Sequence, residues 1–368
     1  MRSEESSVKN SVGRATFVFF AIVSQVFWIL LLIKRLNEYS TLISLCTTIL
    51  TLIVVLWMYN TKMPMGFKLP WIMLILAFPV LGLALYLLLG RSDITRGMRL
   101  RIEKIDEILD KKLVQDEKIL DDLRQSDHSV ANQMAYISKY AKYPVYENTD
   151  VEFYKDASDG FEAQLLELEK AEKFIFIEYH AIEDAVSFGR MKRILAEKVK
   201  QGVDVRILYD DVGSIGFIDS VFVKRMEALG IKCRVFNPLV PVLNMIMNNR
   251  DHRKITVIDG KVGFTGGYNL ADKYFNLENP YGHWKDTGVK LTGDAVRSLT
   301  VTFLELWAAM SKEEMEDITS FFSEITYEAS EKCLVQPYAD SPLDEELVGE
   351  NVYMNIVKTA KRYVYFTT

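Results

Sequence analysis

The sequence predicts an α/β domain, with a mixed, largely parallel sheet covered by helices on both faces, behind a group of N-terminal transmembrane helices. Two observations support this fold class. Three apolar runs, residues 15–33, 41–59 and 69–90, contain no Asp, Glu, Lys or Arg. From about residue 160 onwards, short β-rich runs alternate with amphipathic helical stretches, which is typical of strands joined by helices.

The composition of the chain excludes several classes of protein. A net charge of −6 gives no basic excess of the kind that nucleic-acid binding needs. The cysteines, Cys46, Cys233 and Cys333, are too far apart in the sequence for a disulfide framework or a CxxC pair. The four histidines show no HExxH spacing. We therefore expect no metal, no other cofactor and no nucleic-acid partner.

Each apolar run is close to the ~20 residues that a helix needs to cross the hydrocarbon core of a bilayer. The first run contains Ser24 and Gln25 and is the least certain of the three. Basic residues from Arg91 to Lys104 follow the third run, and the positive-inside bias places this side in the cytoplasm. We expect residues 1–92 to form a multi-pass membrane anchor with two or three crossings. The side of the N-terminus stays open.

The next segments predict a connector and then the α/β domain. Residues 93–138 are charged and carry apolar residues at helical spacing, which predicts an amphipathic helical connector. The connector either packs on the soluble domain or lies on the membrane. The domain itself is expected to begin with helix 161–173, strand 174–180, helix 188–202, strand 203–213, helix 220–229 and strand 231–237.

The stretch NRDHRKITVIDGKVGFTGGYNL, residues 249–270, holds the residues with the clearest chemistry. Asp259 and Gly260 predict the turn of a β-hairpin. Because side chains alternate along a strand, His252 and Lys254 are expected to point to the same side. A neutral imidazole can attack phosphorus, and an ammonium group can neutralise phosphate oxygens. This stretch therefore predicts a site that acts on phosphate esters.

Residues downstream are expected to support that site. Gly266 and Gly267 would let the backbone approach a ligand closely, and the amide of Asn269 can hydrogen-bond phosphate oxygens. A catalytic imidazole needs a carboxylate on its second nitrogen. Asp286 is the better candidate for that contact, because Asp259 lies beyond the other end of the strand. We expect Asp259 to tie together the turn or the neighbouring backbone.

Further polar residues follow two of the predicted strands. Glu178, His180 and Asp184 come at or after the end of the first, and Asp210 and Asp211 end the second. Sites in α/β proteins gather at the carboxyl ends of parallel strands. The first three residues therefore line the pocket or are ordinary loop residues. For Asp210 and Asp211 we favour a structural or hydroxyl-binding role.

The apolar segment PLVPVLNMIMNN, residues 238–249, comes directly before the histidine. One interpretation is a buried segment. The other is a lip that dips into the membrane and admits lipid tails beside the nucleophile.

The pattern HxK(x)4D, formed by His252, Lys254 and Asp259 and followed by Gly266, Gly267 and Asn269, resembles the HKD motif of the phospholipase D superfamily. Residues 69–92, residues 174–214 and the segment WKDTGVKLTGDAV, residues 284–296, resemble bacterial cardiolipin synthases. The resemblance runs from about Leu69 to the C-terminus. It implies a phospholipase D-type α/β domain with His252, Lys254 and Asp259 as its catalytic residues.

The resemblance also implies a function. A membrane-bound phosphatidyltransferase in the bacterial cell membrane, with a cytoplasmic catalytic domain, would make cardiolipin and glycerol from two phosphatidylglycerol molecules through a phosphohistidine. It would need no metal or nucleotide. One alternative is a phospholipase D-type hydrolase, and another is an inactive fragment that anchors or partners a full-length enzyme. Whether His252 is the nucleophile or the proton donor stays open.

The family uses two HKD motifs, whereas this sequence contains one. The segment AKRYVYFTT, residues 360–368, resembles AEKFIFIEY, residues 171–179, in which a helix end precedes a strand. We therefore expect residues 139–335 to be a first catalytic half and residues 336–368 to begin a second, incomplete one. The second motif would then come from a missing C-terminal half or from a second copy in a homodimer.

Overall fold

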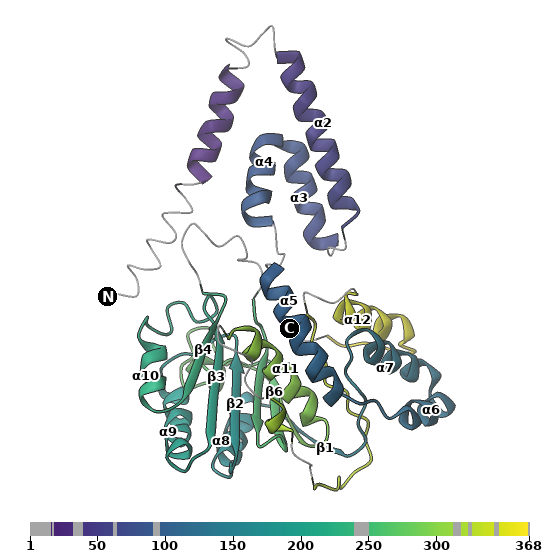
Figure 1. Cartoon of the computed structure of the whole chain (residues 1–368), viewed down its shortest axis with the longest axis vertical. Helices are drawn as coiled ribbons and strands as arrows, with labels where there is room; N and C mark the ends of the chain where they lie inside the picture. Colours follow the sequence, from purple (N-terminus) through teal and green to yellow (C-terminus); the bar gives the residue numbers. More distant parts are fainter. Residues whose placement is uncertain are drawn as a thin grey trace. The chain divides into compact units, whose positions relative to one another are not determined.

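The computed structural model of the chain describes residues 16, 18–31, 40–61, 65–90, 96–238, 250–311, 318–322, 326–341 and 346–366 (Figure 1). The chain divides into two compact units. The N-terminal unit comprises Met1–Ile94 and Leu239–Asn249, and the α/β unit comprises Thr95–Pro238 and Arg250–Thr368. Of the apolar segment expected to be buried or to act as a membrane lip, residues 238–249, all but Pro238 lies outside the described residues.

Helices make up the described part of the N-terminal unit. Residues 18–31 are helical, and they are followed by α2 (Ser40–Tyr59), α3 (Met65–Ala77), α4 (Pro79–Leu85) and the π-helical turn η1 (Tyr86–Gly90). Helix α2 coincides with the second apolar run. A small buried core joins these elements; it is formed by Met58 of α2, Ile75 of α3 and Tyr86 of η1. Among the described residues, no helix is both long enough and apolar enough to cross a membrane.

The third apolar run does not form the single helix that we expected over residues 69–90. It breaks at Phe78, whose φ of −136° and ψ of 78° are not helical, and Pro79 starts α4. Proline suits the first turn of a helix because it has no backbone N–H to leave unpaired. Helix α4 then folds back on α3. A Cβ atom on Gly82 would lie 2.7 Å from the Cα atom of Ile75, so the reversal requires glycine there.

The α/β unit is built on a seven-stranded sheet with the order β1-β7-β6-β5-β2-β3-β4. The strands are β1 (Thr149–Tyr154), β2 (Phe174–Tyr179), β3 (Asp204–Asp210), β4 (Lys232–Phe236), β5 (Lys254–Ile258), β6 (Val262–Gly266) and β7 (Gly288–Gly293). The hairpin of β5 and β6 turns at Asp259 and Gly260, which have φ values of 53° and 68°. The predicted hairpin is therefore confirmed.

The sheet is mixed, as predicted, but the expectation that it is largely parallel is wrong. Strands β2, β3 and β4 are parallel neighbours, and the pairs β2–β5, β5–β6, β6–β7 and β1–β7 are antiparallel. Helical crossovers join the parallel strands, whereas the tight turn between β5 and β6 gives antiparallel neighbours. The sequence analysis did not identify β1 and β7.

Helices cover both faces of the sheet, as predicted. On one face, Ile175 and Ile177 of β2 belong to the same buried cluster as residues of α8 (Ala157–Leu168) and α9 (Val186–Lys200). On the other face, the ring of Phe176 stacks on Phe303 of α11 (Val296–Ala309), with 4.4 Å between ring centroids. Helix α10 (Phe222–Ala228) packs beside β4.

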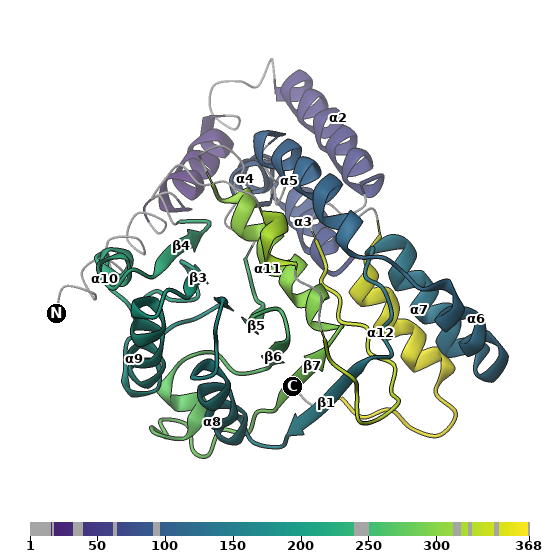
Figure 2. The same ribbon diagram turned by 60° about the horizontal axis from the view of Figure 1, so that its bottom comes forward.

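The predicted connector packs on the α/β unit. It forms α5 (Arg96–Leu109), α6 (Glu117–Ser126) and α7 (His128–Tyr140). Helix α5 runs alongside α11 (Figures 1 and 2), and its apolar residues Ile102, Ile105 and Leu109 are buried. Of the two interpretations of the connector, the structure supports packing on the soluble domain.

The last described element is α12 (Val348–Thr359), which contacts α7 (Figure 2). The strand expected at residues 360–368 is not formed over residues 360–366, and residues 367–368 lie outside the described part. Tyr363 and Tyr365 are exposed. A strand needs a hydrogen-bonded neighbour, and this segment has none among the described strands.

Candidate active site

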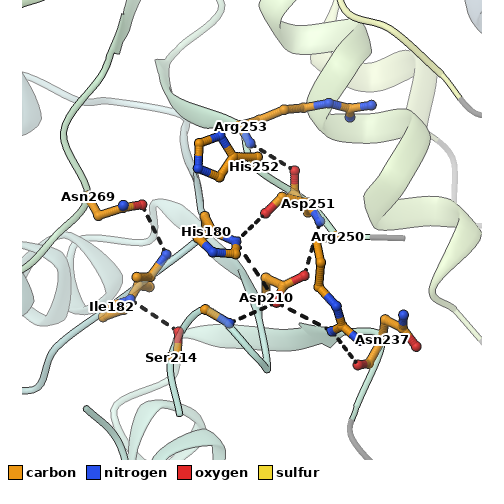
Figure 3. Close-up of polar contacts among 12 residues, drawn as sticks. His180, Ile182, Asp210, Ser214, Asn237, Arg250, Asp251, His252, Arg253 and Asn269 are labelled. Carbon is orange, nitrogen blue, oxygen red and sulfur yellow. Dashed lines mark hydrogen bonds and ion pairs between the residues drawn. The ribbon is translucent and has the colours of Figure 1, made fainter. Parts of the chain in front are cut away.

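Two histidines meet where β2 ends and β5 begins. Tyr179 lies opposite Lys254 in the antiparallel pair β2–β5, so the chain leaves β2 and enters β5 at the same edge of the sheet. His180 follows β2 and His252 precedes β5. Their ring centroids are 4.9 Å apart, with 57° between the ring planes (Figure 3). Of the candidate pocket residues, His180 is therefore the one placed beside the HKD histidine.

The surroundings of His252 favour its neutral form. Partial burial lowers its pKa below the usual 6.5, and Lys254 and His180 act in the same direction. A neutral imidazole has a free lone pair, which is the form that attacks phosphorus. The side chain is exposed, so a substrate can reach it.

Lys254 is buried directly behind the histidine. It is 6% exposed, and its Nζ donates a 2.6 Å hydrogen bond to the backbone carbonyl of His252. Burial lowers the pKa of Lys254 to about 8, while the carboxylates of Asp251 and Asp286 oppose this change. The ammonium group therefore keeps its charge at neutral pH and loses it in mildly alkaline solution.

Asp210 holds the loop that carries the histidine. This carboxylate is fully buried at the end of β3 and accepts hydrogen bonds from the backbone N–H groups of Asp251 (3.0 Å) and Gly213 (2.9 Å). The Nδ1 atom of His180 donates to the backbone carbonyl of Asp251 at 2.8 Å and lies 3.9 Å from Asp210 (Figure 3). The structural role favoured for Asp210 is confirmed. The sequence analysis missed Asp251.

Glu178 and Asp184 do not line an open pocket beside His252. Glu178 is fully buried, with its nearest cation, Arg253, at 3.5 Å. The carboxylate of Asp184 is engaged by Lys192 at 2.5 Å and by Arg225 at 2.8 Å. The sequence left a pocket role and an ordinary loop position open for these two residues. The structure gives Glu178 a buried position and Asp184 two salt bridges.

Asp259 ties backbone together, as expected, and does so away from the histidine. Its carboxylate oxygens accept hydrogen bonds from the backbone N–H groups of Glu172, Lys173 and Phe174 at 2.7–2.8 Å. These bonds fix the start of β2 at the end of β5 opposite His252. Although Asp259 belongs to the HKD motif, its position indicates a structural role.

Asn269 connects the end of β2 to the segment after β6. Its Oδ1 accepts a hydrogen bond from the N–H of Ala181 at 3.1 Å, and its Nδ2 donates to the hydroxyl of Tyr274 at 3.1 Å. The side chain is 5% exposed. The phosphate contact expected for Asn269 stays a prediction.

The two glycines at the end of β6, Gly266 and Gly267, lie so close to other atoms of the protein that a side chain would not fit there. A Cβ on Gly266 would lie 2.6 Å from the carbonyl oxygen of Thr287, and one on Gly267 would lie 2.1 Å from Oδ1 of Asp286. The residues before β7 therefore approach both glycines closely, and the close approach of a ligand that we expected there stays a prediction. The charge of Asp286 acts on Lys254, and its contact with His252 stays a prediction.

Nothing in the described part of the chain resembles a metal centre. No group of three or more His, Cys, Asp or Glu side chains there could hold a metal ion. The chemistry that the arrangement offers is that of an exposed neutral imidazole backed by a buried cation.

We predict that Gly267→Ala destabilises the protein by about 1–3 kcal/mol, because the new methyl group displaces Asp286. Gly189→Ala in α9 is the matched control, since no atom lies within 4 Å of its added Cβ, and it should stabilise the helix by about 0.5–1 kcal/mol. Urea denaturation of the full chain in detergent measures both. If Asp286→Ala leaves the cost of Gly267→Ala unchanged, the proposed clash is wrong.

Comparisons with known proteins found two matching family models. Residues 165–307 match the family described as "Cardiolipin synthase, PLD-like domain", and residues 48–91 match "Phospholipase_D-nuclease N-terminal". Among solved structures, NucT from Helicobacter pylori aligns with 44% of this chain and 97% of its own length, at 12% identity and a TM-score of 0.35.

Curated relatives are similar over most of the chain. An uncharacterized protein of Streptococcus mutans is 39% identical over 85% of this chain and 68% of its own length. A cardiolipin synthase of Geobacillus kaustophilus is 30% identical over 90% of this chain and 65% of its own length, and one of Oceanobacillus iheyensis is 30% identical over 81% and 62%. The chain thus spans about two thirds of the length of these relatives. It belongs to the bacterial cardiolipin synthase family of phospholipase D-like enzymes.

Proposed function

We propose that this chain supplies one HKD half of a phosphatidyltransferase that makes cardiolipin and glycerol from two phosphatidylglycerol molecules. The observation that carries this proposal is a pair of side chains. A substrate can reach His252, although its partial burial lowers its pKa, and Lys254 is a buried cation next to it. The names of the cardiolipin synthase relatives support the choice of substrate.

In the proposed first step, a ring nitrogen of His252 attacks the phosphorus of phosphatidylglycerol. A P–N bond forms, the P–O bond to the terminal glycerol breaks, and the glycerol oxygen takes a proton from a second histidine. In the next step, a hydroxyl of another phosphatidylglycerol gives its proton back to that histidine and attacks phosphorus, so that the P–N bond breaks. Both steps add negative charge to the non-bridging oxygens, which Lys254 can offset.

The proposed reaction needs a second histidine, and this sequence contains one HKD motif. We propose that it comes from a second HKD half, contributed either by a second copy of the chain or by a C-terminal half of a longer protein. The edge of the sheet that carries His252 would then face the equivalent edge of that half. Transfer to water instead of lipid would give phosphatidic acid, and this hydrolysis is the competing outcome.

The proposed activity is tested with phosphatidylglycerol labelled with 32P in its phosphate, incubated in mixed micelles with the full chain and a second HKD half, and quenched under alkaline conditions that preserve phosphohistidine. We expect a labelled adduct on the peptide that contains His252, from which the label passes to cardiolipin. His252→Ala should reduce the adduct more than about 1000-fold, because the nucleophile is lost.

His128→Ala is the matched control, since His128 is exposed at the start of α7; its adduct should form at the rate of the unchanged chain. Adduct that persists in His252→Ala would contradict the assignment of the nucleophile. If the label is recovered in phosphatidic acid rather than in cardiolipin, the protein is a hydrolase. If no label becomes attached to the protein, the chain is an inactive partner of another enzyme.

We also propose that the N-terminal unit attaches the protein to the membrane, with the α/β unit in the cytoplasm. The support is an exposed apolar surface on α2 and α3, formed by Leu42, Leu45, Leu52, Ile53, Leu56, Leu69 and Met73. Contiguous apolar surface of this kind marks contacts with lipid or with another protein. The basic residues that follow, Arg96, Arg99, Arg101 and Lys104, would lie on the anionic cytoplasmic side.

Replacing Leu45, Leu52 and Leu56 together with serine should reduce binding to phosphatidylglycerol vesicles by more than about tenfold, because each leucine contributes apolar area. Vesicle flotation measures the bound fraction. The control replaces Val151, Leu166 and Leu277 with serine, which are similarly exposed but belong to the α/β unit. Equal loss of binding in the two triple variants would contradict attachment through the N-terminal unit.

A further inference from the structure

Two buried carboxyl groups lie close to the paired histidines in the sequence and in the sheet. Glu178, near the end of β2, is fully buried, and Asp251, directly before His252, is 5% exposed. The Oε2 atom of Glu178 and the Oδ2 atom of Asp251 are both shut off from solvent, and each lacks a hydrogen-bond donor. The two side chains are nevertheless within hydrogen-bonding reach of one another.

Two ionised carboxylates cannot form that hydrogen bond, because both offer acceptors and neither offers a donor. Burying two negative charges in contact without a donor between them is also costly. One proton between the two oxygens removes both problems. We propose that Glu178 and Asp251 share a single proton, and that this acid–carboxylate pair positions the loop that carries His252.

The charges around the pair favour one bound proton. The other carboxylates close to the pair or to its neighbours are Asp210, Asp286 and Glu305, and the cations are Arg250, Arg253 and Lys254. Carboxyl groups therefore exceed cations, which favours a bound proton in the buried pair. Burial, with the charge of Asp251, raises the pKa of Glu178 well above its usual value, and burial raises the pKa of Asp251.

The position of Asp251 explains how the pair acts on the site. Its backbone carbonyl accepts the hydrogen bond from His180, its backbone N–H donates to Asp210, and its Oδ1 accepts from the N–H of Arg253 at 3.1 Å (Figure 3). The remaining oxygen, Oδ2, has no hydrogen-bond donor. The side chain of Asp251 lies within hydrogen-bonding reach of Glu178, which is fixed in the sheet opposite Ile255. Loss of the shared proton would push Asp251 away from Glu178 and so move both histidines.

The shared proton makes the stability of the fold depend on pH. Because the pKa of Glu178 is raised by folding, the native chain holds a proton that the unfolded chain releases above about pH 4.5. Stability therefore falls as pH rises from there towards the pKa of the native pair. The unfolding equilibrium constant should gain a factor of about ten per pH unit from this one proton.

Glu178→Gln is the decisive variant, because its amide N–H can donate permanently to Asp251 where the proton lies now. We expect its free energy of unfolding at pH 5 to be close to that of the unchanged chain. Its unfolding equilibrium constant should no longer rise tenfold per pH unit. Asp251→Asn is a second variant with the same expected loss. Glu178→Ala should be less stable at every pH, because it leaves Oδ2 of Asp251 without a donor. Glu152→Gln, at an exposed carboxylate, is the control and should change nothing.

These measurements use urea denaturation of the full chain in detergent from pH 5 to pH 9. The geometry of the loop is measured separately, as the rate at which diethyl pyrocarbonate modifies His252 in peptide-resolved mass spectrometry, with exposed His128 as internal reference. Glu178→Gln should keep the rate of the unchanged chain, and Glu178→Ala should alter it at least about threefold. A Glu178→Gln variant that retains the full pH dependence and resembles Glu178→Ala in both readouts would overturn the proposal.

The effect of the pair on phosphatidyl transfer rests on the proposed function, but the pair itself does not. Neither readout involves lipid. Failure of the proposed function would therefore show as absent transfer in the unchanged chain, whereas failure of this inference would show in the unfolding and modification data.

Discussion

The antiparallel pairing of β2 with β5 is the constraint on which the candidate active site depends. Because Tyr179 lies opposite Lys254, residues 178–180 and 251–254 converge at one edge of the sheet. This register brings the ring of His180 against that of His252 and the carboxyl of Glu178 against that of Asp251. At the other end of the same pair, Asp259 binds the backbone that starts β2 and so opposes any slip of the register. The motif aspartate and the motif histidine thus act at opposite ends of one strand.

The site combines a reactive surface with a charged interior. His252 is exposed, whereas Lys254, Asp210, Asp251 and Glu178 are buried. Buried charges keep their positions only when each has a partner, so this interior holds residues 250–253, directly before β5, in place. A fixed backbone suits a histidine that, in the proposed reaction, meets phosphorus along a defined line. The same burial lowers the pKa of Lys254 and His252, so the interior also sets the charges that a substrate would meet in the proposed reaction.

Local sequence patterns predicted the parts of the fold that depend on local interactions. The turn at Asp259 and Gly260 and the helices on both faces follow from turn chemistry and hydrophobic periodicity. Strand β1 was missed because much of it is exposed at the sheet edge and its apolar pattern is weak. The third apolar run was mistaken for one helix, because the reversal depends on Gly82 packing on Ile75, a contact that the sequence does not reveal. Asp251 was missed for a similar reason, since Glu178 and Asp210 reach it only through the pairing of distant strands.

The pKa of His252 tests the convergence of β2 and β5 most directly. It is measured by NMR titration of the full chain, labelled with 13C at histidine Cε1, in detergent micelles. The arrangement predicts a pKa below 6.5. It also predicts an increase in His180→Asn, whose amide can still donate to the carbonyl of Asp251 while the neighbouring imidazole is gone. A pKa of His252 at or above 6.5 that does not change in His180→Asn would contradict the arrangement.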